Sequence, residues 1–278
     1  MPSSAVAIIA YRAEPDAGEL ASLRQCCSTL GRHQLFLVCP ESLPLGRYLE
    51  EAARAGARLE PVRFPDHWFQ SVRTYNRLML DSEFYERFSM VEYLLVYQLD
   101  AWVFSDALEA WCARGYSYVG APFFNDRHEL FPFAGNGGFS LRKIPDFIAL
   151  LRGTLPMRDY DRDFPEVRLP ARTRLRGALK GLLHRAEMRL CRASSKWYCR
   201  LMWEHEDFIY AKAFSLLGKQ HVPAPREAAH FAFERCPELL FAWTGGKLPF
   251  GCHAHGKYGH SFWRRWIIPE NARVQAQR

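Results

Sequence analysis

The strongest candidate for chemistry is Asp100, which directly follows the apolar run Tyr93–Leu99. A nearly unbroken run of this kind is typical of a strand that is buried on both faces. In open α/β sheets, ligands bind beyond the carboxyl ends of the strands, so we expect Asp100 to face a ligand crevice. A carboxylate placed there could hold a divalent cation that neutralises a diphosphate leaving group. The alternative is a carboxylate that only caps the turn after the strand.

A glycine-rich stretch, Gly135–Arg142, has three glycines among its first four residues. Glycine lets the backbone approach a ligand closely or adopt a positive φ, so this stretch is a candidate ligand loop. Phe131, Phe133 and Phe139 stand nearby in the sequence and could form a wall on which a ring stacks. An ordinary tight turn that leads into a strand is the alternative.

Acidic residues gather at positions 204–207, immediately before an apolar helical pattern that Gly218 ends. Among them, Glu206 or Asp207 could act as a general base. The alternative carries equal weight, because acids in a first helical turn are favoured by the helix dipole whatever the function.

Two histidines, His253 and His255, occur in a stretch that has Gly251 before them and Gly256 after them. Their imidazoles could ligate a metal ion or bind a phosphate. A surface loop that contains histidines by chance is the alternative.

The elements that must position these residues alternate between short apolar strands and helical stretches. Alternating strands and helices predict an α/β fold with a mostly parallel central sheet, and we expect residues 1–270 to form a single domain. The predicted strands are 6–11, 34–38, 58–63, 93–99, 116–120 and 138–141, and the predicted helices are 18–30, 47–55, 69–88, one from about 145, and 206–217. We expect the polar tail at 271–278 to be frayed.

The net charge of +7 comes from one segment of the chain, residues 158–200. Within it, residues 169–190 show the periodicity of a basic amphipathic helix, which we interpret as a helical insert in the domain. Such a helix could lie on an anionic membrane surface, or it could pack on its own domain with a solvated basic face. Since no nucleic-acid motif accompanies the charge, we expect no nucleic-acid partner.

Several classes of protein are disfavoured by the motifs that the sequence lacks. It contains no glycine-rich dinucleotide fingerprint, no Walker sequence and no nucleophile elbow, which argues against dehydrogenases, P-loop enzymes and α/β-hydrolases. No apolar run is long enough to span a membrane, and the start of the chain does not read as a signal peptide, so we expect a cytoplasmic location. The eight cysteines form no C-x-x-C pair, so we expect free, mostly buried thiols.

Taken together and in this order, four stretches resemble a nucleotide-sugar glycosyltransferase of the GT-A fold. They also look like a bacterial family known only as a domain of unknown function and associated with surface-polysaccharide loci. The resemblance covers roughly residues 5–150 and 200–260. The four stretches are Tyr75–Leu78, Tyr97–Ala101, Gly135–Arg142 and Gly251–His253.

The resemblance implies roles for particular residues. Asp100 matches the final acid of the D-x-D motif of GT-A enzymes, which holds Mn²⁺ or Mg²⁺ against the donor diphosphate, and His253 matches the histidine that often completes that metal site. Gln98 stands where the motif has its first acid, which weakens the expected hold on a cation. Glu206 and Asp207 match the acidic pair that supplies the base in fringe-like β-3-glycosyltransferases, which implies an inverting reaction.

The resemblance therefore implies a transferase that moves a sugar from a nucleotide-diphosphate donor, with a UDP-sugar favoured, to a glycan or lipid-linked acceptor. The implied location is the cytoplasm, with possible peripheral attachment to the inner membrane face. The expected donor-binding residues are Tyr11, Arg12, Tyr75, Asn76, Gln98 and Asp100, and the expected acceptor-binding residues are Trp102, Asn136, Gly137 and Gly138.

Two other classes of function compete with this interpretation. A protein of the same fold could bind nucleotide-sugars or glycans without turnover, and Gln98 in place of an acid keeps that alternative open. A metal-dependent hydrolase or nucleotidyltransferase ranks lowest, because one carboxylate at a strand end is too few for a two-metal site.

Overall fold

The centre of the molecule is a sheet of six strands in the order β3-β2-β1-β4-β9-β6. The computed structural model describes residues 2–155, 182, 186, 189–191, 193–201, 205–218 and 220–267. The strands of this sheet are β1 (Ser4–Ile9), β2 (Gln34–Pro40), β3 (Leu59–Phe64), β4 (Tyr93–Gln98), β6 (Tyr118–Val119) and β9 (Phe139–Lys143).

Strand direction places the glycine-rich stretch at the ligand edge of the sheet. Strands β1 to β4 run parallel, which confirms the predicted α/β class with a mostly parallel sheet. Strand β9 is antiparallel to both β4 and β6, and it pairs Phe139 with Tyr97. Because β9 runs the opposite way, its amino end lies beside the carboxyl end of β4. The loop of Gly135–Gly138 therefore meets Asp100 at one edge.

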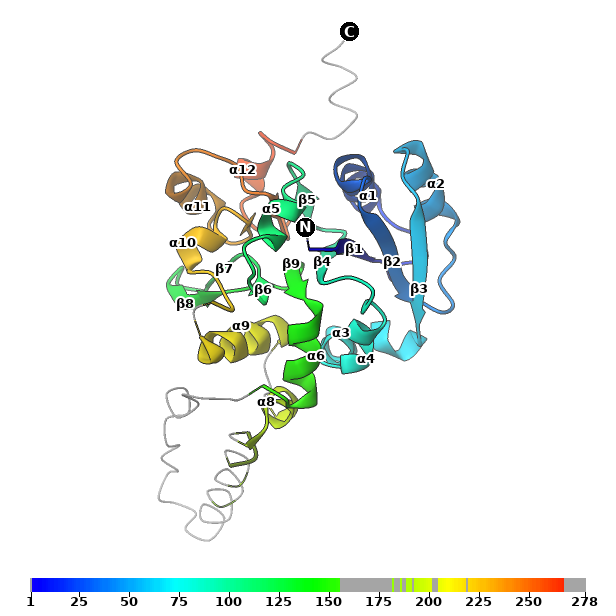
Figure 1. Cartoon of the computed structure of the whole chain (residues 1–278). Coiled ribbons are helices and arrows are strands. Elements are labelled where there is room, and N and C mark those ends of the chain that lie inside the picture. The colour runs from blue at the N-terminus through cyan, green and yellow to red at the C-terminus, as the bar shows by residue number, and fades with distance from the viewer. Residues whose placement is uncertain are drawn as a thin grey trace, which may run out of the picture.

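Helices cover both faces of this sheet, which gives three layers (Figure 1). Alternate side chains of each strand point to opposite faces, so that Val6 and Ile8 join one core cluster while Ala5 and Ala7 join the other. The first cluster includes residues of α1 (Ala17–Leu30), α2 (Gly46–Arg54) and α5 (Leu108–Cys112). The second includes residues of α3 (Val72–Met79), α4 (Ser82–Glu86), α6 (Ile144–Arg152), α8 (Ser195–Leu201) and α9 (Glu206–Leu217).

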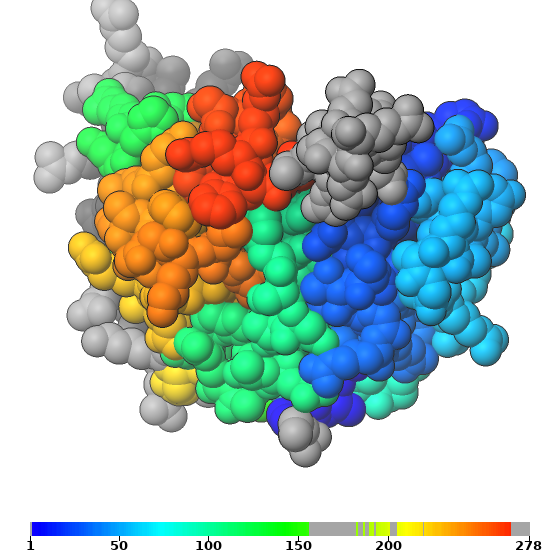
Figure 2. All heavy atoms as spheres, turned by 90° about the horizontal axis from the view of Figure 1, so that it is seen from above, coloured from blue at the N-terminus to red at the C-terminus, as the bar shows by residue number. Residues whose placement is uncertain are grey.

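A smaller sheet and a hairpin complete the side of the molecule that carries the C-terminal elements. The small sheet pairs β10 (Ala232–Phe233) with β11 (Gly251–Cys252) and β11 with β5 (Trp102–Val103). The hairpin joins β7 (Pro122–Phe124) to β8 (Leu130–Ala134). Seen from above, the middle of the chain lies between the N-terminal part and the C-terminal part (Figure 2). The remaining helices here are α10 (Pro225–Ala228), α11 (Pro237–Trp243) and α12 (His260–Trp263).

One predicted helix, 69–88, is divided into two helices, with a 3₁₀ turn before them. A 3₁₀ turn, η1, covers Asp66–Phe69, and α3 and α4 follow as separate helices. Ser71 caps α3, with its side chain accepting the N–H of Thr74, and Asp81 caps α4 in the same manner. Capping side chains satisfy the free N–H groups of a new helix start, so the apolar periodicity continues while the helix does not.

Of the remaining sequence predictions, some concern described residues and others do not. The eight cysteines, all of them among the described residues, form no disulfide, and seven of them are buried, as expected. In the part of the chain that the structure describes, no helix is long and apolar enough to cross a membrane. Most of the basic segment 158–200, the tail 271–278 and Glu204 lie outside the described residues. The single-domain assignment and the amphipathic insert therefore stay predictions.

Candidate active site

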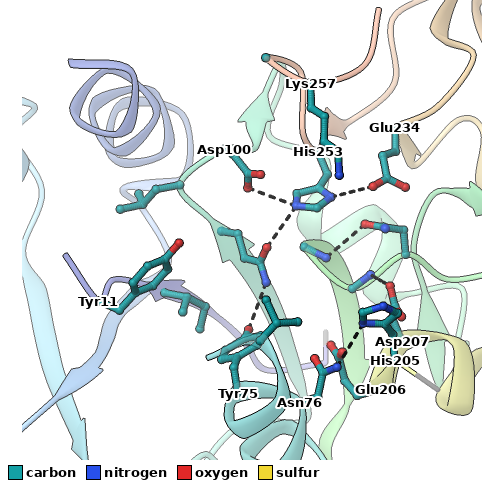
Figure 3. A pocket seen from close by; sticks show the side chains of 18 of the residues that line it. Tyr11, Tyr75, Asn76, Asp100, His205, Glu206, Asp207, Glu234, His253 and Lys257 are labelled. Atoms are coloured by element: carbon teal, nitrogen blue, oxygen red, sulfur yellow. Dashed lines mark hydrogen bonds and ion pairs between the residues drawn. The ribbon is translucent and has the colours of Figure 1, made fainter. Parts of the chain in front are cut away.

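A cavity of about 1190 Å³ opens at the edge of the sheet where β1 and β4 end. Its wall combines these strand ends with α3, the glycine loop, the start of α9 and the segment after β11 (Figure 3). The predicted site residues that line it are Tyr11, Arg12, Tyr75, Asn76, Gln98, Asp100, Asn136, Gly137, Gly138, Glu206, Asp207 and His253.

Within this cavity, Asp100, Glu234 and His253 form a group with Gln98 that we name the histidine cluster. The small sheet brings them together, because β11 pairs Cys252 with Trp102 of β5 and with Phe233 of β10. Nε2 of His253 lies 3.1 Å from Oδ1 of Asp100, and Nδ1 lies 3.3 Å from Oε1 of Glu234. The imidazole is therefore held between two carboxylates.

Gln98 links the histidine cluster to the opposite wall of the cavity. Its amide oxygen lies 3.1 Å from Nε2 of His253, and its amide nitrogen donates to the hydroxyl of Tyr75 at 3.3 Å. The residue just before β9, whose carbonyl oxygen accepts the N–H of Gln98, must be glycine, since a Cβ on Gly138 would lie 2.0 Å from Nε2 of His253. A side chain at position 138 would displace the imidazole.

The two carboxylates set the charge of His253. Burial by itself lowers the pKa of an imidazole, but hydrogen bonds and charges from Asp100 and Glu234 outweigh burial and raise the pKa of His253 to about 10. Burial raises the pKa of Asp100, but the hydrogen bond and the charge of His253, with smaller contributions from a backbone N–H and from His255, together outweigh burial and hold that pKa below its ordinary value. At neutral pH the pair is thus an imidazolium beside a carboxylate.

The donor atoms of this cluster fit a divalent cation in type. Carboxylate and amide oxygens with an imidazole nitrogen suit Mg²⁺ or Mn²⁺, and Glu234 on Nδ1 is the kind of partner that orients a metal-binding histidine. Among the described residues, no group of three or more His, Cys, Asp or Glu is arranged to hold a metal ion. A bound cation would therefore need the amide oxygen of Gln98 beside Asp100 and His253.

On another part of the wall, Glu206 and Asp207 form what we name the carboxylate pair, at the first turn of α9. Oδ2 of Asp207 accepts the N–H of Gly137 at 3.1 Å. A Cβ on Gly137 would lie 2.8 Å from Oε1 of Glu206, so the loop approaches the helix more closely than a side chain allows. With its amide nitrogen facing Glu206, Asn76 donates to Oε2 at 2.9 Å.

A fully buried guanidinium, that of Arg142, lies behind the carboxylate pair. Its Nη2 lies 3.5 Å from Oε1 of Glu206 and 3.4 Å from the carbonyl oxygen of Gly137. Its Nη1 donates to the hydroxyl of Tyr85 at 2.7 Å, and its Nε donates to Oγ of Ser140 at 3.1 Å. Every side of the guanidinium is thus engaged, and it connects Glu206 to the glycine loop.

Burial dominates the protonation of the carboxylate pair. It raises the pKa of Glu206, the charge of Asp207 raises it further, and Arg142 offsets only part of this, so that the pKa of Glu206 is about 7. Burial also raises the pKa of Asp207 and outweighs the hydrogen bonds from the N–H groups of Gly137 and Phe208. A carboxylate with a raised pKa takes up a proton near neutral pH, as a general base requires.

Three rings that the sequence placed at the site, those of Trp102, Phe133 and Phe139, are not among the described residues that line the cavity. Trp102 is not among the described residues that line the cavity, because its indole packs in the core beside the small sheet and meets His255 edge-on, with ring centroids 6.1 Å apart. Phe139 is fully buried against Phe231 and Phe250. Phe131 does line the cavity.

At the end of β1, Tyr11 and Arg12 lie on the cavity wall as expected. Tyr11 is 54% exposed. The guanidinium of Arg12 is already paired with Asp16 at 3.2 Å and with Glu19 at 3.3 Å, at the start of α1. Tyr11 is therefore the freer of the two to meet a ligand.

Three residues at or behind the cavity wall were not identified from the sequence. Glu234 follows a strand of two residues, which is too short for any periodicity to mark. Lys257 lies in the stretch that drew notice for its histidines, and its side chain lines the cavity near the histidine cluster (Figure 3). Arg142 ends the glycine-rich stretch, but nothing in that pattern marks it as buried.

Several solved structures have a chain path similar to that of this protein. The glycosyltransferase GlyE of Streptococcus pneumoniae TIGR4 matches with a TM-score of 0.48 and 10% identity over 100% of this chain, which spans 60% of that one. The galactosyltransferase LgtC, in complex with donor and acceptor sugar analogues, matches with a TM-score of 0.49 and 12% identity over 97% of this chain and 99% of that one. Core-mannan synthase A of Aspergillus fumigatus, in a Mn/GDP form, matches with a TM-score of 0.42 and 10% identity over 77% of this chain and 70% of that one.

Comparison of sequences places the chain in a family. No curated protein matches it at a significant level. Residues 58–253 match the family described as protein of unknown function, DUF5672, and this range contains the histidine cluster, the glycine loop and the carboxylate pair. The match extends over more than half of the 278 residues. The chain therefore belongs to the DUF5672 family.

Proposed function

We propose that the protein is a glycosyltransferase of the GT-A type that transfers a sugar, with inversion, from a nucleotide-diphosphate donor to a glycan or lipid-linked acceptor. One observation carries the proposal: a single cavity at the carboxyl edge of the sheet holds the imidazolium of His253, with Lys257 near it, on one part of its wall and a buried carboxylate pair on another. An inverting transfer needs positive charge for the leaving group and a base for the attacking hydroxyl.

The donor diphosphate is assigned to the histidine cluster. The imidazolium of His253 and the ammonium of Lys257 both line the cavity there and would attract the diphosphate oxygens. The nucleoside would extend toward Tyr11 at the end of β1, and a UDP-sugar is the favoured donor. A divalent cation held by Asp100, Gln98 and Nε2 of His253 would displace the proton from that nitrogen, and its positive charge beside the diphosphate would replace that of the imidazolium.

Asp207 is assigned as the base. The acceptor oxygen bonds to C1 of the sugar as the bond between C1 and the diphosphate oxygen breaks, with its electron pair leaving on the nucleoside diphosphate. The proton of the acceptor hydroxyl passes to a carboxylate oxygen of Asp207. Both acids accept hydrogen bonds, but Asp207 accepts only backbone N–H groups and is half-buried. Glu206 is less suited, because its side chain is only 7% exposed and lies against the guanidinium of Arg142.

The first experiment is calorimetry of the full chain with a panel of UDP-sugars and GDP-sugars, with and without Mn²⁺, followed by an assay for free nucleotide. We expect binding of a UDP-sugar and release of UDP when an acceptor extract is added. Binding of no nucleotide-sugar would overturn the proposal.

A second candidate function is binding of nucleotide-sugars or glycans without turnover. Gln98 favours it, because an amide in place of the first acid of the motif binds a cation more weakly than a carboxylate does. Tight binding with no nucleotide release under any metal or acceptor would select this function over transfer.

Attachment to the cytoplasmic face of a membrane is proposed from the sequence of residues 158–200. Each basic residue near an anionic surface contributes about 1 kcal/mol, and salt screens that attraction. The protein should therefore co-sediment with anionic vesicles at low salt and not with neutral vesicles. Neutralising Arg172, Arg174, Arg176 and Lys180 together should abolish sedimentation, and equal sedimentation of that variant would refute the attachment.

A further inference from the structure

Four phenylalanine rings gather beside the carboxylate pair. Phe208 is the centre of the group, with ring centroids 5.5, 5.3 and 5.0 Å from those of Phe123, Phe131 and Phe133. Phe123 comes from β7 and the next two from β8, while Phe208 directly follows Asp207 on the first turn of α9. The hairpin and the helix thus build one aromatic wall next to the proposed base.

The rings divide into two kinds by what they contact. Phe123 and Phe133 pack against the core cluster beneath the sheet, whereas Phe131 and Phe208 belong to none of the core clusters of the described residues. Phe131 and Phe208 nevertheless line the cavity and are only half-buried, and Phe133 does not line it. Core packing therefore does not account for Phe131 and Phe208.

The alternation of side chains along β8 places the ring of Phe131 on the side that faces Phe208. Residues two apart on a strand share a face, so Phe131 and Phe133 lie on the side of Phe208, while Leu130 and Pro132 lie on the exposed side. The wall continues to Asp207, whose carboxylate borders the same cavity. An apolar ring surface with a hydrogen-bond acceptor at its border is thus presented to the cavity.

From this arrangement we infer that Phe131 and Phe208 form the acceptor subsite and bind a pyranose ring by stacking on its C–H face. This inference rests on the proposed function and names the acceptor class for the same site. A pyranose has an apolar face of C–H groups and hydroxyls around its rim, so one ring can contact the wall and direct a hydroxyl toward Asp207. The subsite replaces Trp102, which does not line the cavity.

Other occupants fit the wall less well. A lipid chain would use the rings but has no group for the bordering carboxylate. A nucleobase would place the donor at the carboxylate pair, away from the end of β1 and from the histidine cluster that is assigned to its diphosphate. The acceptor sugar satisfies both the rings and the carboxylate.

The test is saturation-transfer difference NMR on the full chain with methyl β-D-galactopyranoside and methyl α-D-glucopyranoside as probes. We expect saturation on the C–H protons of one ring face, and much less on galactitol, which has hydroxyls but no ring. Phe131→Ala should weaken the pyranoside signal about tenfold, the order of one lost aromatic contact. Phe133→Ala is the matched control, because it removes a ring from the same group that does not reach the cavity, and it should weaken the signal far less than Phe131→Ala does.

The inference would be overturned by no ring saturation, by equal loss from Phe131→Ala and Phe133→Ala, or by stronger saturation of geranyl monophosphate than of the sugars. A fall in UDP affinity with Phe131→Ala would also overturn it, because the wall would then hold the nucleobase. The readout needs no turnover, so a protein that stacks the pyranoside but releases no nucleotide would refute the proposed transferase and keep the subsite.

Discussion

The histidine cluster and the carboxylate pair line one cavity, yet the pKa values of their acidic side chains are shifted in opposite directions. Asp100 is 57% exposed and lies beside an imidazolium, so its pKa falls and it stays ionised. Glu206 is 7% exposed and lies beside another acid, so its pKa rises to about 7 even with Arg142 behind it. Exposure and the sign of the nearest charge thus give the acids different pKa values, so that Asp100 stays ionised while the carboxylate pair can take up a proton.

This contrast assigns fixed charge to one part of the cavity and a movable proton to the other. A charge that must be present throughout the reaction is best carried by a pair such as Asp100 and His253, whose protonation does not change near neutral pH. A proton acceptor must change its protonation, which the raised pKa of the carboxylate pair permits. Each prediction below alters one side of the contrast.

The largest effect is expected from Asp207→Asn, which removes the proposed proton acceptor from the carboxylate pair. We expect kcat to fall by about 10²- to 10⁴-fold, the usual share of a general base, with donor affinity little changed. Glu206→Gln should be milder, because Glu206 is held by Arg142 and Asn76. Steady-state kinetics of both variants measure the ranking. A reversed ranking would make Glu206 the base. If neither substitution had an effect, the two acids would serve only as residues that the helix dipole favours at the start of α9.

The next effect concerns the fixed charge. Asp100→Asn should lower kcat/KM by about 10²-fold without unfolding the protein, because a half-exposed carboxylate contributes to ligand binding and not to the core. Asp106→Asn is a matched control: Asp106 forms a similar pair, 3.0 Å from Nε2 of His33, outside the cavity. Turnover near that of the wild type in Asp100→Asn, or an equal loss in Asp106→Asn, would contradict the role of the histidine cluster.

The third prediction is the pH dependence of kcat. The base acts unprotonated, so kcat should fall as the pH drops below about 7, where the carboxylate pair takes up its first proton. Glu206→Gln should move this acid limb to lower pH, because it removes the neighbouring negative charge that disfavours ionisation of Asp207. A pH profile of kcat for both proteins measures the shift, and an unmoved limb would place the titrating group elsewhere.

The two regions differ also in how far the sequence predicts them. Asp100 was predictable because the apolar run before it marks a buried strand, and Glu206 because Gly218 and the apolar pattern mark the helix that it starts. Glu234 was not predictable, since β10 has two residues and its place beside His253 depends on pairing with β11. Local patterns carry no information on such pairings between distant segments.

The same limit explains the misplaced rings. Trp102 follows Asp100 closely, but β5 pairs with β11 and turns the indole into the core. The loop glycines show their purpose only in three dimensions, where Gly138 leaves room for His253 and Gly137 for Glu206. The glycine content could indicate a ligand loop. Only the approach of α9 and of the residue after β11 to this loop shows which atoms fill the space that a side chain would need.

The smallest effect is expected in stability rather than catalysis. The pKa of Glu206 is about 7 in the folded chain against an ordinary value of 4.5, so the folded state binds more protons than the unfolded state between these limits. The contribution of this group to stability should therefore be complete below about pH 4.5 and be lost, by about 3 kcal/mol in all, as the pH rises to about 7.

Glu206→Gln tests this linkage, because an amide keeps the shape of the protonated acid and cannot ionise. Relative to the wild type, the variant should gain stability as the pH rises from 5 to 8, visible as a difference of a few degrees in Tm that is absent at pH 5. Thermal denaturation of both proteins at each pH measures it. If the two Tm values stayed equal at pH 8, Arg142 would neutralise Glu206 fully. The carboxylate pair would then resemble the histidine cluster, with an acid held ionised by a cation, and the contrast between the two regions would disappear.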